Sequence, residues 1–287
     1  MKDMLSWQGI SRQAAHKGIA RLGKYTRDLL DTFELADKVR INHPRMGCRD
    51  IYYSMQDQMP RGRDWTEKHL LEYGYRVHRG SKSFTRAGEH TCSNLIEGKT
   101  IDGPNQVWQT DITYYWCNNR WYYLSFIVDV YTREILASHC SIDLSSASQI
   151  TCLKKAVKSQ KGRDLSNLIV HSDRGIQYTC GEFKQYLATQ GFKQSMAHYA
   201  WQNAYCERVN RTIKNNYLKP FNPKTYNGLC KGIAKAIRAY NGSKPHGNLP
   251  KRLAPKQFLK EWVQGEHKDY EVKIWSKLTS TNTLNIN

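Results

Sequence analysis

"LSNLIVHSDRG" (residues 165–175) sets an apolar run directly against a Ser-Asp-Arg-Gly sequence. The run predicts a buried strand over residues 165–172, and the carboxylate of Asp173 follows at once. Carboxylates are costly near a protein core and Asp is depleted in strands, so an acid at this point needs a specific reason. A partner that compensates its charge would supply that reason.

Further strands and helices surround this run. Aromatic and β-branched residues predict strands over 105–116, 120–132, 133–142 and 192–197. Apolar residues at helical spacing, with caps and stops such as Gly191, predict helices over 143–162, 181–191, 203–218 and 226–242. The core order is β-β-β-α-β-α-β-α, which predicts a mixed five-stranded sheet flanked by helices.

Residues 1–80 read as a separate helical region. Helices are predicted over 11–39, 43–58 and 64–77, with Thr66 as a cap and Gly74 as a stop. Two short helices around a tight connection suggest a helix-turn-helix that binds DNA, although a small helical bundle without DNA contact fits the same pattern. The predicted domains are a helical region (1–80), a linker (81–104), a catalytic core with its C-terminal helix (105–262) and a basic, polar tail (263–287).

The charge of the chain favours a polyanionic partner. The 287 residues carry a formal charge of +19 and a pI of about 9.6, with both flanks basic and the middle nearly balanced. Nucleic acid is the first interpretation of such a distribution, and a merely basic soluble protein is the alternative.

Other compositional signals narrow the class of protein. The eight cysteines form no C-x-x-C pair, so the sequence shows neither a zinc knuckle nor a redox motif. No secretory signal and no run of 18 apolar residues is present, so we expect a cytoplasmic protein with no membrane partner.

Two further acids join Asp173 as candidates. Asp111 lies in the middle of a predicted strand, where a structural hydrogen bond or ion pair is the alternative explanation. Glu207 lies on the polar face of the helix over 203–218, together with Asn203, Asn210, Arg211 and Lys214. That face is also what a solvated helix with a Glu207–Arg211 pair would show.

The three acids together point to metal chemistry. Two acids on strands and one on a later helix can converge at one end of a sheet, where they repel one another unless a cation lies between them. Hard divalent ions prefer oxygen ligands, and magnesium is the natural choice. Two such ions, about 3.5–4 Å apart, can activate an attacking oxygen and stabilise the leaving oxygen of a phosphodiester.

Several ordered motifs then resemble a known family. "PNQVWQTDITYYW" (104–116), "VDVYTREILA" (128–137), "HSDRGIQYT" (171–179), "QSMA" (194–197) and "YNGSKPHGNL" (240–249) resemble the DDE transposases of insertion sequences, whose core is similar to retroviral integrases. The resemblance extends from about His43 to Trp262, and "HPRMGCRDIY" (43–52) is similar to the helix-turn-helix segment before that core.

The resemblance implies a ribonuclease H-like fold and assigns the site. Asp111, Asp173 and Glu207 would be the catalytic residues and the ligands of two Mg²⁺ ions per site, with Mn²⁺ as a substitute. It also implies DNA contacts near the cleavage site by the following residues: Lys214, Arg211, Arg174, Gln177 and Asn203. Trp108 matches an aromatic position that we assign to packing.

Activity and partners follow from the same resemblance. It implies metal-dependent cleavage at mobile-element ends and transfer of the 3′-hydroxyl into target DNA, by a homodimer or higher oligomer on double-stranded DNA of the bacterial nucleoid. Family members are often made as longer fusions, so an upstream DNA-binding portion is compatible with it. The alternatives are a nuclease of the same fold that does not join DNA, or a catalytically inactive DNA-binding protein. Only 33 residues separate Asp173 from Glu207, slightly fewer than in the family pattern.

Overall fold

The computed structural model describes residues 11–77 and 92–274. By its contacts the chain divides into two compact units, Met1–Arg79 and Gly80–Asn287, which are treated separately below. Parts of the predicted helical region (1–10 and 78–80), linker (81–91) and tail (275–287) lie outside the described residues. None of the helices in the described ranges is both long and apolar enough to cross a membrane.

The first unit is helical, as the sequence predicts. It contains α2 (Arg12–Asn42), α3 (Cys48–Ser54), a short 3-10 turn (Gln56–Gln58) and α4 (Arg63–Glu72). The Ser11 hydroxyl caps α2 by accepting a hydrogen bond from the amide of Ala14 (3.1 Å). A small core joins the three helices through the following residues: Ala36, Val39, Met46, Cys48, Ile51 and Leu70.

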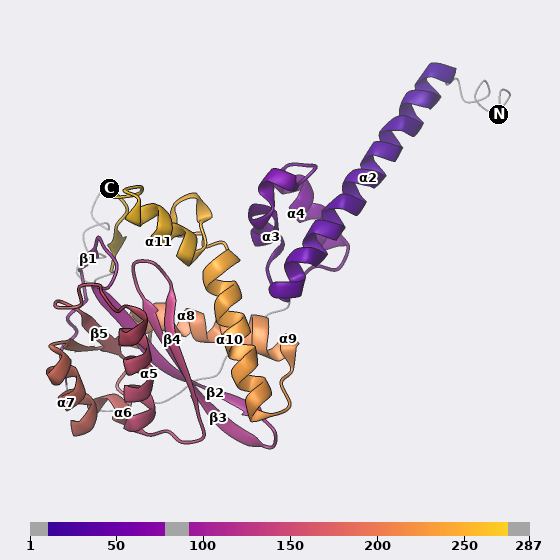
Figure 1. Ribbon diagram of the computed structural model, residues 1–287. Helices are drawn as coiled ribbons and strands as arrows, with labels where there is room; N and C mark the ends of the chain where they lie inside the picture. Colours follow the sequence, from indigo (N-terminus) through magenta and orange to yellow (C-terminus); the bar gives the residue numbers. More distant parts are fainter. Residues whose placement is uncertain (1–10, 78–91, 275–287) are drawn as a thin grey trace, which may run out of the picture. The chain divides into compact units, whose positions relative to one another are not determined.

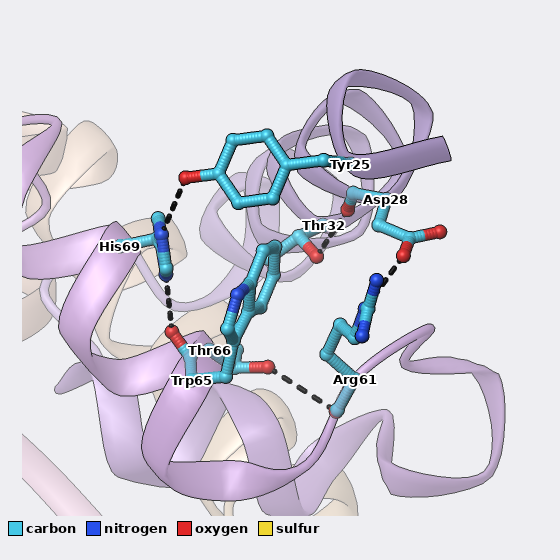
Figure 2. Close-up of polar contacts among 7 residues, drawn as sticks. All are labelled: Tyr25, Asp28, Thr32, Arg61, Trp65, Thr66 and His69. Carbon is cyan, nitrogen blue, oxygen red and sulfur yellow. Dashed lines mark hydrogen bonds and ion pairs between the residues drawn. The ribbon is translucent and has the colours of Figure 1, made fainter. Parts of the chain in front are cut away.

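Polar contacts also attach α4 to α2 (Figure 2). Arg61 forms a 2.6 Å ion pair with Asp28, and the Tyr25 hydroxyl is hydrogen-bonded to Nε2 of His69 (2.8 Å). Nδ1 of the same ring donates to the carbonyl oxygen of Trp65 (2.7 Å). These contacts fix α4 in place, whereas the contact of this unit with DNA stays a prediction.

Of the two predicted ends of α4, the structure confirms the C-terminal one and contradicts the N-terminal one. Gly74 has φ +89°, a conformation that favours glycine, and it ends the helix as predicted. Thr66 is not the cap. The helix begins three residues earlier, at Arg63, and Thr66 is buried inside it with its hydroxyl near the carbonyl oxygen of Arg61 (3.4 Å).

The second unit contains the predicted mixed sheet of five strands (Figure 1). Its strands are β2 (Val107–Cys117), β3 (Arg120–Asp129), β4 (Ile135–Ser141), β5 (Ile169–Ser172) and β6 (Lys193–Met196). The spatial order is β4-β3-β2-β5-β6, with β2–β3 and β3–β4 antiparallel and β2–β5 and β5–β6 parallel. Three meandering strands followed by parallel strands with helical crossovers form a ribonuclease H-like sheet.

Helices cover both faces of this sheet. One face packs on α5 (Ser146–Ser159), α6 (Ile176–Thr179) and α7 (Gly181–Gln190), around the buried Trp108. The other face packs on α8 (Ala204–Thr212), its continuation and α10 (Tyr226–Ser243). Since Tyr115 and Cys117 belong to the second core, Asp111 on the same strand face points toward α8 and α10.

The predicted helix over 203–218 is not one regular α-helix. After Thr212 the backbone continues as a π-helical segment, Ile213–Leu218, and then as the short α9 (Lys219–Phe221). A wider turn of this kind changes which side chains face the sheet, and such segments often occur at functional sites. Residues 213–218 contain no Pro or Gly, but Pro220 in α9 lacks the amide that would donate to the preceding turn, so it is a sequence signal for the change.

The segments before and after the sheet also differ from the sequence-based prediction. Ile96 and Ile101 are buried in the second unit, although they fall in the predicted linker. Thr100–Ile101 (β1) pairs with Val272–Lys273 (β7) from the predicted tail, and α11 (Pro255–Val263) packs beside this ribbon. Elements of two residues are too short to show a periodic pattern.

Candidate active site

Side chains on one face of β2 form hydrogen bonds with one side of the helix that carries Glu207. Successive residues of that face, Gln109, Asp111 and Thr113, each contact the helix. The side-chain oxygen of Gln109 accepts hydrogen bonds from the amides of Tyr205 (3.1 Å) and Cys206 (3.3 Å), in the first turn of α8. The strand therefore holds the start of α8 through backbone groups that would otherwise lack partners.

The next two steps along the strand involve side chains. Asn210 donates a 2.7 Å hydrogen bond to Oδ2 of Asp111. One helical turn later, Nζ of Lys214 donates to the hydroxyl of Thr113 (2.7 Å) and lies 3.4 Å from the carbonyl oxygen of Tyr114. Two residues along the strand, from Asp111 to Thr113, thus correspond to four residues along the helix, from Asn210 to Lys214.

Asp111 lies in an environment that disfavours its charge. Burial, followed by the negative charges of Asp173 and Glu207, raises the pKa of Asp111 to about 8. Hydrogen bonds from the amide of Ile112 (2.9 Å) and from Asn210 act in the opposite direction. The three acids are therefore close enough to influence one another.

Asp173 directly follows β5, which lies beside β2 in the sheet. Its Oδ1 accepts a hydrogen bond from the amide of Gly175 (3.0 Å). The side chain reaches solvent, but protein atoms surround it enough that burial raises the pKa of its carboxyl group. A Cβ atom at Gly175 would lie 3.1 Å from this carboxylate and 2.7 Å from Oε1 of Gln177, so a larger residue here would displace one or both side chains.

Glu207 lies in the first turn of α8 with its side chain exposed. Burial and the charge of Asp173 raise the pKa of Glu207, while Arg211, one turn later, lowers it. Glu207 thus interacts electrostatically both with Asp173, as an acidic site requires, and with Arg211, as a solvated helix face would show.

The donor set suits a hard divalent cation. Burial raises the pKa of all three carboxyl groups, and the charge of Asp173 further raises the pKa values of Asp111 and Glu207. A positive charge between the acids would therefore stabilise their ionised forms, and their oxygens are the ligands that magnesium prefers. Within residues 11–77 and 92–274, however, no three His, Cys, Asp or Glu side chains are grouped closely enough to hold a metal ion as they stand. The case for a metal rests on the chemistry and charge of the acids.

Comparisons with known proteins add a family to this geometry. Two family models, each described as an integrase core domain, match residues 102–199 and 192–253, which together are more than half of the chain. Residues 102–253 of the chain thus form an integrase core domain. The chain is 31% identical over 125 residues to a putative transposase for the insertion sequence element IS986/IS6110 of Mycobacterium tuberculosis, covering 42% of this chain and 45% of that protein. The chain thus spans less than half the length of this relative.

Two other proteins show similarity. An uncharacterized transposase-like protein of Haemophilus influenzae is 29% identical over 232 residues, which are 79% of this chain and 97% of that protein. A solved structure of the HTLV-2 integrase catalytic core domain in complex with magnesium is 23% identical, covers 54% of this chain and 96% of that chain, and has a TM-score of 0.43.

The integrase core places the residues that we predicted to contact DNA in different environments. Arg211 is exposed beside Glu207, whereas Lys214 is half-buried against β2 and burial lowers its pKa. Nε of Arg174 donates to the carbonyl oxygen of Ala197 (3.0 Å), and Gln177 is buried beside Gly175. Their contacts with DNA stay predictions.

Asn203 and Trp108 are structural in this integrase core. Asn203 is 1% exposed, and its Nδ2 donates to the carbonyl oxygen of Thr110 (3.0 Å), which adds a second link between β2 and the start of α8. This burial gives no support to a DNA contact by Asn203. Trp108 is fully buried and donates to Oδ1 of Asn105 (3.1 Å), which confirms the assignment to packing.

The sequence places Gln109 on the strand face of Asp111 and Asn210 on the helix face of Glu207, but it does not predict that these two residues position the acids. Gln109 also donates to the carbonyl oxygen of Gln202 (3.0 Å), so both ends of its amide hold the segment before Glu207. The available signal was a polar residue two positions before Asp111 on the same strand face. For Asn210 it was a polar residue three positions after Glu207 on the same helix face.

Proposed function

We propose that this protein is a DNA transposase that cuts at the ends of a mobile element and joins the freed 3′-hydroxyl to target DNA. The observation that carries the proposal is the bonded contact between β2 and α8, which brings Asp111 and Glu207 within electrostatic reach of each other and of Asp173. The match to the integrase core domain and the similarity to insertion-sequence transposases support the same reaction.

Asp111, Asp173 and Glu207 would hold two Mg²⁺ ions, with Mn²⁺ as a substitute. When bound, such ions lower the pKa of an attacking hydroxyl and stabilise the leaving oxygen of a phosphodiester. Asn210 donates a hydrogen bond to Oδ2 of Asp111, and the amide of Ile112 donates one to Oδ1, so both oxygens of this carboxylate are held in position. The contribution of the protein is thus to fix acidic oxygens in place, and it needs no covalent intermediate with DNA.

The reaction balances without an energy source. In the first step water attacks a phosphodiester at the element end, the bond to the 3′-oxygen breaks, and that oxygen takes a proton. In the second step this 3′-hydroxyl attacks a target phosphodiester, and the 3′-oxygen of the target strand leaves with a proton. One P–O bond forms for each one that breaks.

The partners would be double-stranded DNA of both kinds, element ends and target. The formal charge of +19 suits a salt-sensitive affinity for phosphates, to which Arg211, Arg174 and Lys214 would contribute near the acids. Two element ends must be held side by side during the reaction, so we expect a homodimer or higher oligomer on DNA, acting on the bacterial nucleoid in the cytoplasm.

A joining assay tests the proposal. The full chain is incubated with a labelled oligonucleotide that carries an end of the element and with plasmid target, in Mg²⁺, in Mn²⁺ or in EDTA. We expect joined products with either metal and none in EDTA. Cleavage without joining would reject the transposase in favour of the nuclease of the same fold.

A catalytically inactive DNA-binding protein is the second candidate. The absence of a preformed group of three metal ligands among the described residues favours it. Calorimetry with Mn²⁺ at low salt, with and without end DNA, separates the two candidates. Saturable Mn²⁺ binding that Asp111→Asn abolishes supports the enzyme, and no binding under either condition supports the inactive protein.

A further inference from the structure

A small cavity lies on the same face of the sheet as the acids but is lined by other residues. It has a volume of about 60 Å³ and lies between the end of β3, α8, the end of α10 and the loop 246–248. Four of its lining residues, Arg133, Arg208, His246 and Asn248, have side-chain nitrogen donors. Arg133 and His246 belong to stretches of the family resemblance that the catalytic acids do not explain.

Two buried nitrogen atoms at this cavity have no hydrogen-bond partner. They are Nη1 of Arg133, whose residue is only 8% exposed, and Nε2 of His246. A buried donor without a partner is costly, and a buried guanidinium more so, which means that such groups in native proteins usually meet a ligand or ordered water.

The charged residues that line the cavity, Arg133 and Arg208, are both positive. Among the described residues, neither Arg133 nor Arg208 forms an ion pair with a carboxylate. Burial, together with the neighbouring cations Lys244, Arg133 and Arg208, lowers the pKa of His246 well below its usual range. The imidazole is therefore neutral, and its Nε2 can donate beside two fixed positive charges.

The backbone holds Arg133 in an unfavourable conformation. Arg133 lies in the turn between β3 and β4 with φ +63°, a region that glycine or asparagine occupies more easily. Its guanidinium carbon lies 4.1 Å from the centre of the Tyr205 ring, so the cation is stacked on α8. A strained arginine whose charge is directed into a cavity suggests that the charge has a use there.

We propose that this cavity binds a phosphate group. A guanidinium donates in a fixed fork that fits two phosphate oxygens, and the unpartnered imidazole nitrogen supplies a further donor. By the usual measure of about 10–15 Å³ per water, the cavity holds roughly four or more water-sized atoms, enough for the oxygens of one phosphate. Its mouth is open, because Arg208, Gly247 and Asn248 are exposed.

The phosphate has two possible sources with the same chemistry, inorganic phosphate or a phosphodiester of DNA. The second rests on the proposed function. Arg208 follows Glu207 on α8 and lies about 100° around the helix from it, so a strand bound here would run past the acids.

Calorimetry with inorganic phosphate tests the site in the full chain. We expect one phosphate per chain. Arg208→Gln, at an exposed position, and Arg133→Asn, which suits the turn, should each lower the affinity at least about tenfold, the loss expected for one charge-assisted hydrogen bond. The matched control is Arg238→Gln, since Arg238 is an exposed arginine on α10 away from the cavity, and it should bind as the wild type does.

The DNA arm measures binding of duplex DNA in EDTA at several salt concentrations. If a DNA phosphodiester occupies the site, Arg208→Gln lowers the slope of log K against log salt by about 0.9 relative to Arg238→Gln. An equal slope in the two variants assigns the site to free phosphate. Absence of saturable phosphate binding by the wild type, or an equal loss in Arg238→Gln, overturns the proposal. Loss of DNA joining with phosphate binding intact would contradict only the proposed function.

Discussion

Asn210 on α8 donates a 2.7 Å hydrogen bond to Oδ2 of Asp111 on β2, across 99 positions of sequence. This bond fixes one catalytic candidate and at the same time attaches the helix that carries another, Glu207. The placement of the acids therefore depends on residues that are not themselves acids, and the predictions below begin with these.

Asn210→Ala should lower the rate of strand transfer by at least about tenfold, because a hydrogen bond to a charged group is worth about 1.5–3 kcal/mol. The rate of joining end DNA to a plasmid measures this. Asn227→Ala, at an exposed position of α10, is the matched control. Equal rates in the wild type and in both variants would show that Asn210 does not position Asp111.

Gln109→Ala should destabilise the second unit. Its loss leaves two amides of α8 and the carbonyl oxygen of Gln202 without their partner, at a cost of about 1–3 kcal/mol for a buried group left unsatisfied. Urea unfolding followed by tryptophan fluorescence measures the free energy of unfolding. The exposed Gln185→Ala should change it by less than about 0.5 kcal/mol, and a similar small effect at Gln109 would refute the anchoring role.

Gly175→Ala should impair activity more than folding. The backbone of Gly175 has φ −59°, which any residue adopts, so the effect comes from crowding of the added methyl group against Asp173 and Gln177. We expect less than about 1 kcal/mol of lost stability, because both crowded atoms are ends of flexible side chains, and a displaced Asp173 carboxylate that lowers strand transfer. Gly181→Ala is the control, because nothing lies within 4 Å of its added Cβ. Strand transfer by Gly175→Ala at the wild-type rate would contradict this account.

In the first unit, Asp28→Ala should loosen α4. The change removes the 2.6 Å ion pair between Asp28 and Arg61 (Figure 2). The side chain of Asp28 is only 11% exposed. Because Arg61 itself is 40% exposed, the expected loss is no more than about 1 kcal/mol. Faster amide hydrogen exchange over Arg63–Glu72 would measure it, with Asp31→Ala, an exposed acid of α2, as control.

The fold was largely predictable because its main elements have distinct local patterns. The aromatic and β-branched residues of β2 and β3 alternate as strands do, and Gly191 ends α7 with φ +71°. Asp173 was predictable as a candidate site residue because this acid directly follows a run of apolar residues. These are properties of neighbouring residues, so a single sequence displays them.

What the sequence did not predict depends on contacts between distant residues. Gln109 holds amides 96 and 97 positions away, and the two-residue strand β1 exists only because Val272 and Lys273 pair with it. Thr66 was predicted as a cap, but α4 begins at Arg63 and Thr66 is buried inside it. The attachment of Lys214 to Thr113 likewise follows from the sheet–helix contact.

The most direct test of the central claim is strand transfer in Mg²⁺ by three variants, Asp111→Asn, Asp173→Asn and Glu207→Gln, with the exposed Glu266→Gln as control. If the three acids act as one metal-binding unit, each substitution should reduce joining by at least about a thousandfold. All three variants should still bind DNA, and the control should join it at the wild-type rate. Full activity in Asp111→Asn or Glu207→Gln would contradict the assignment of this site.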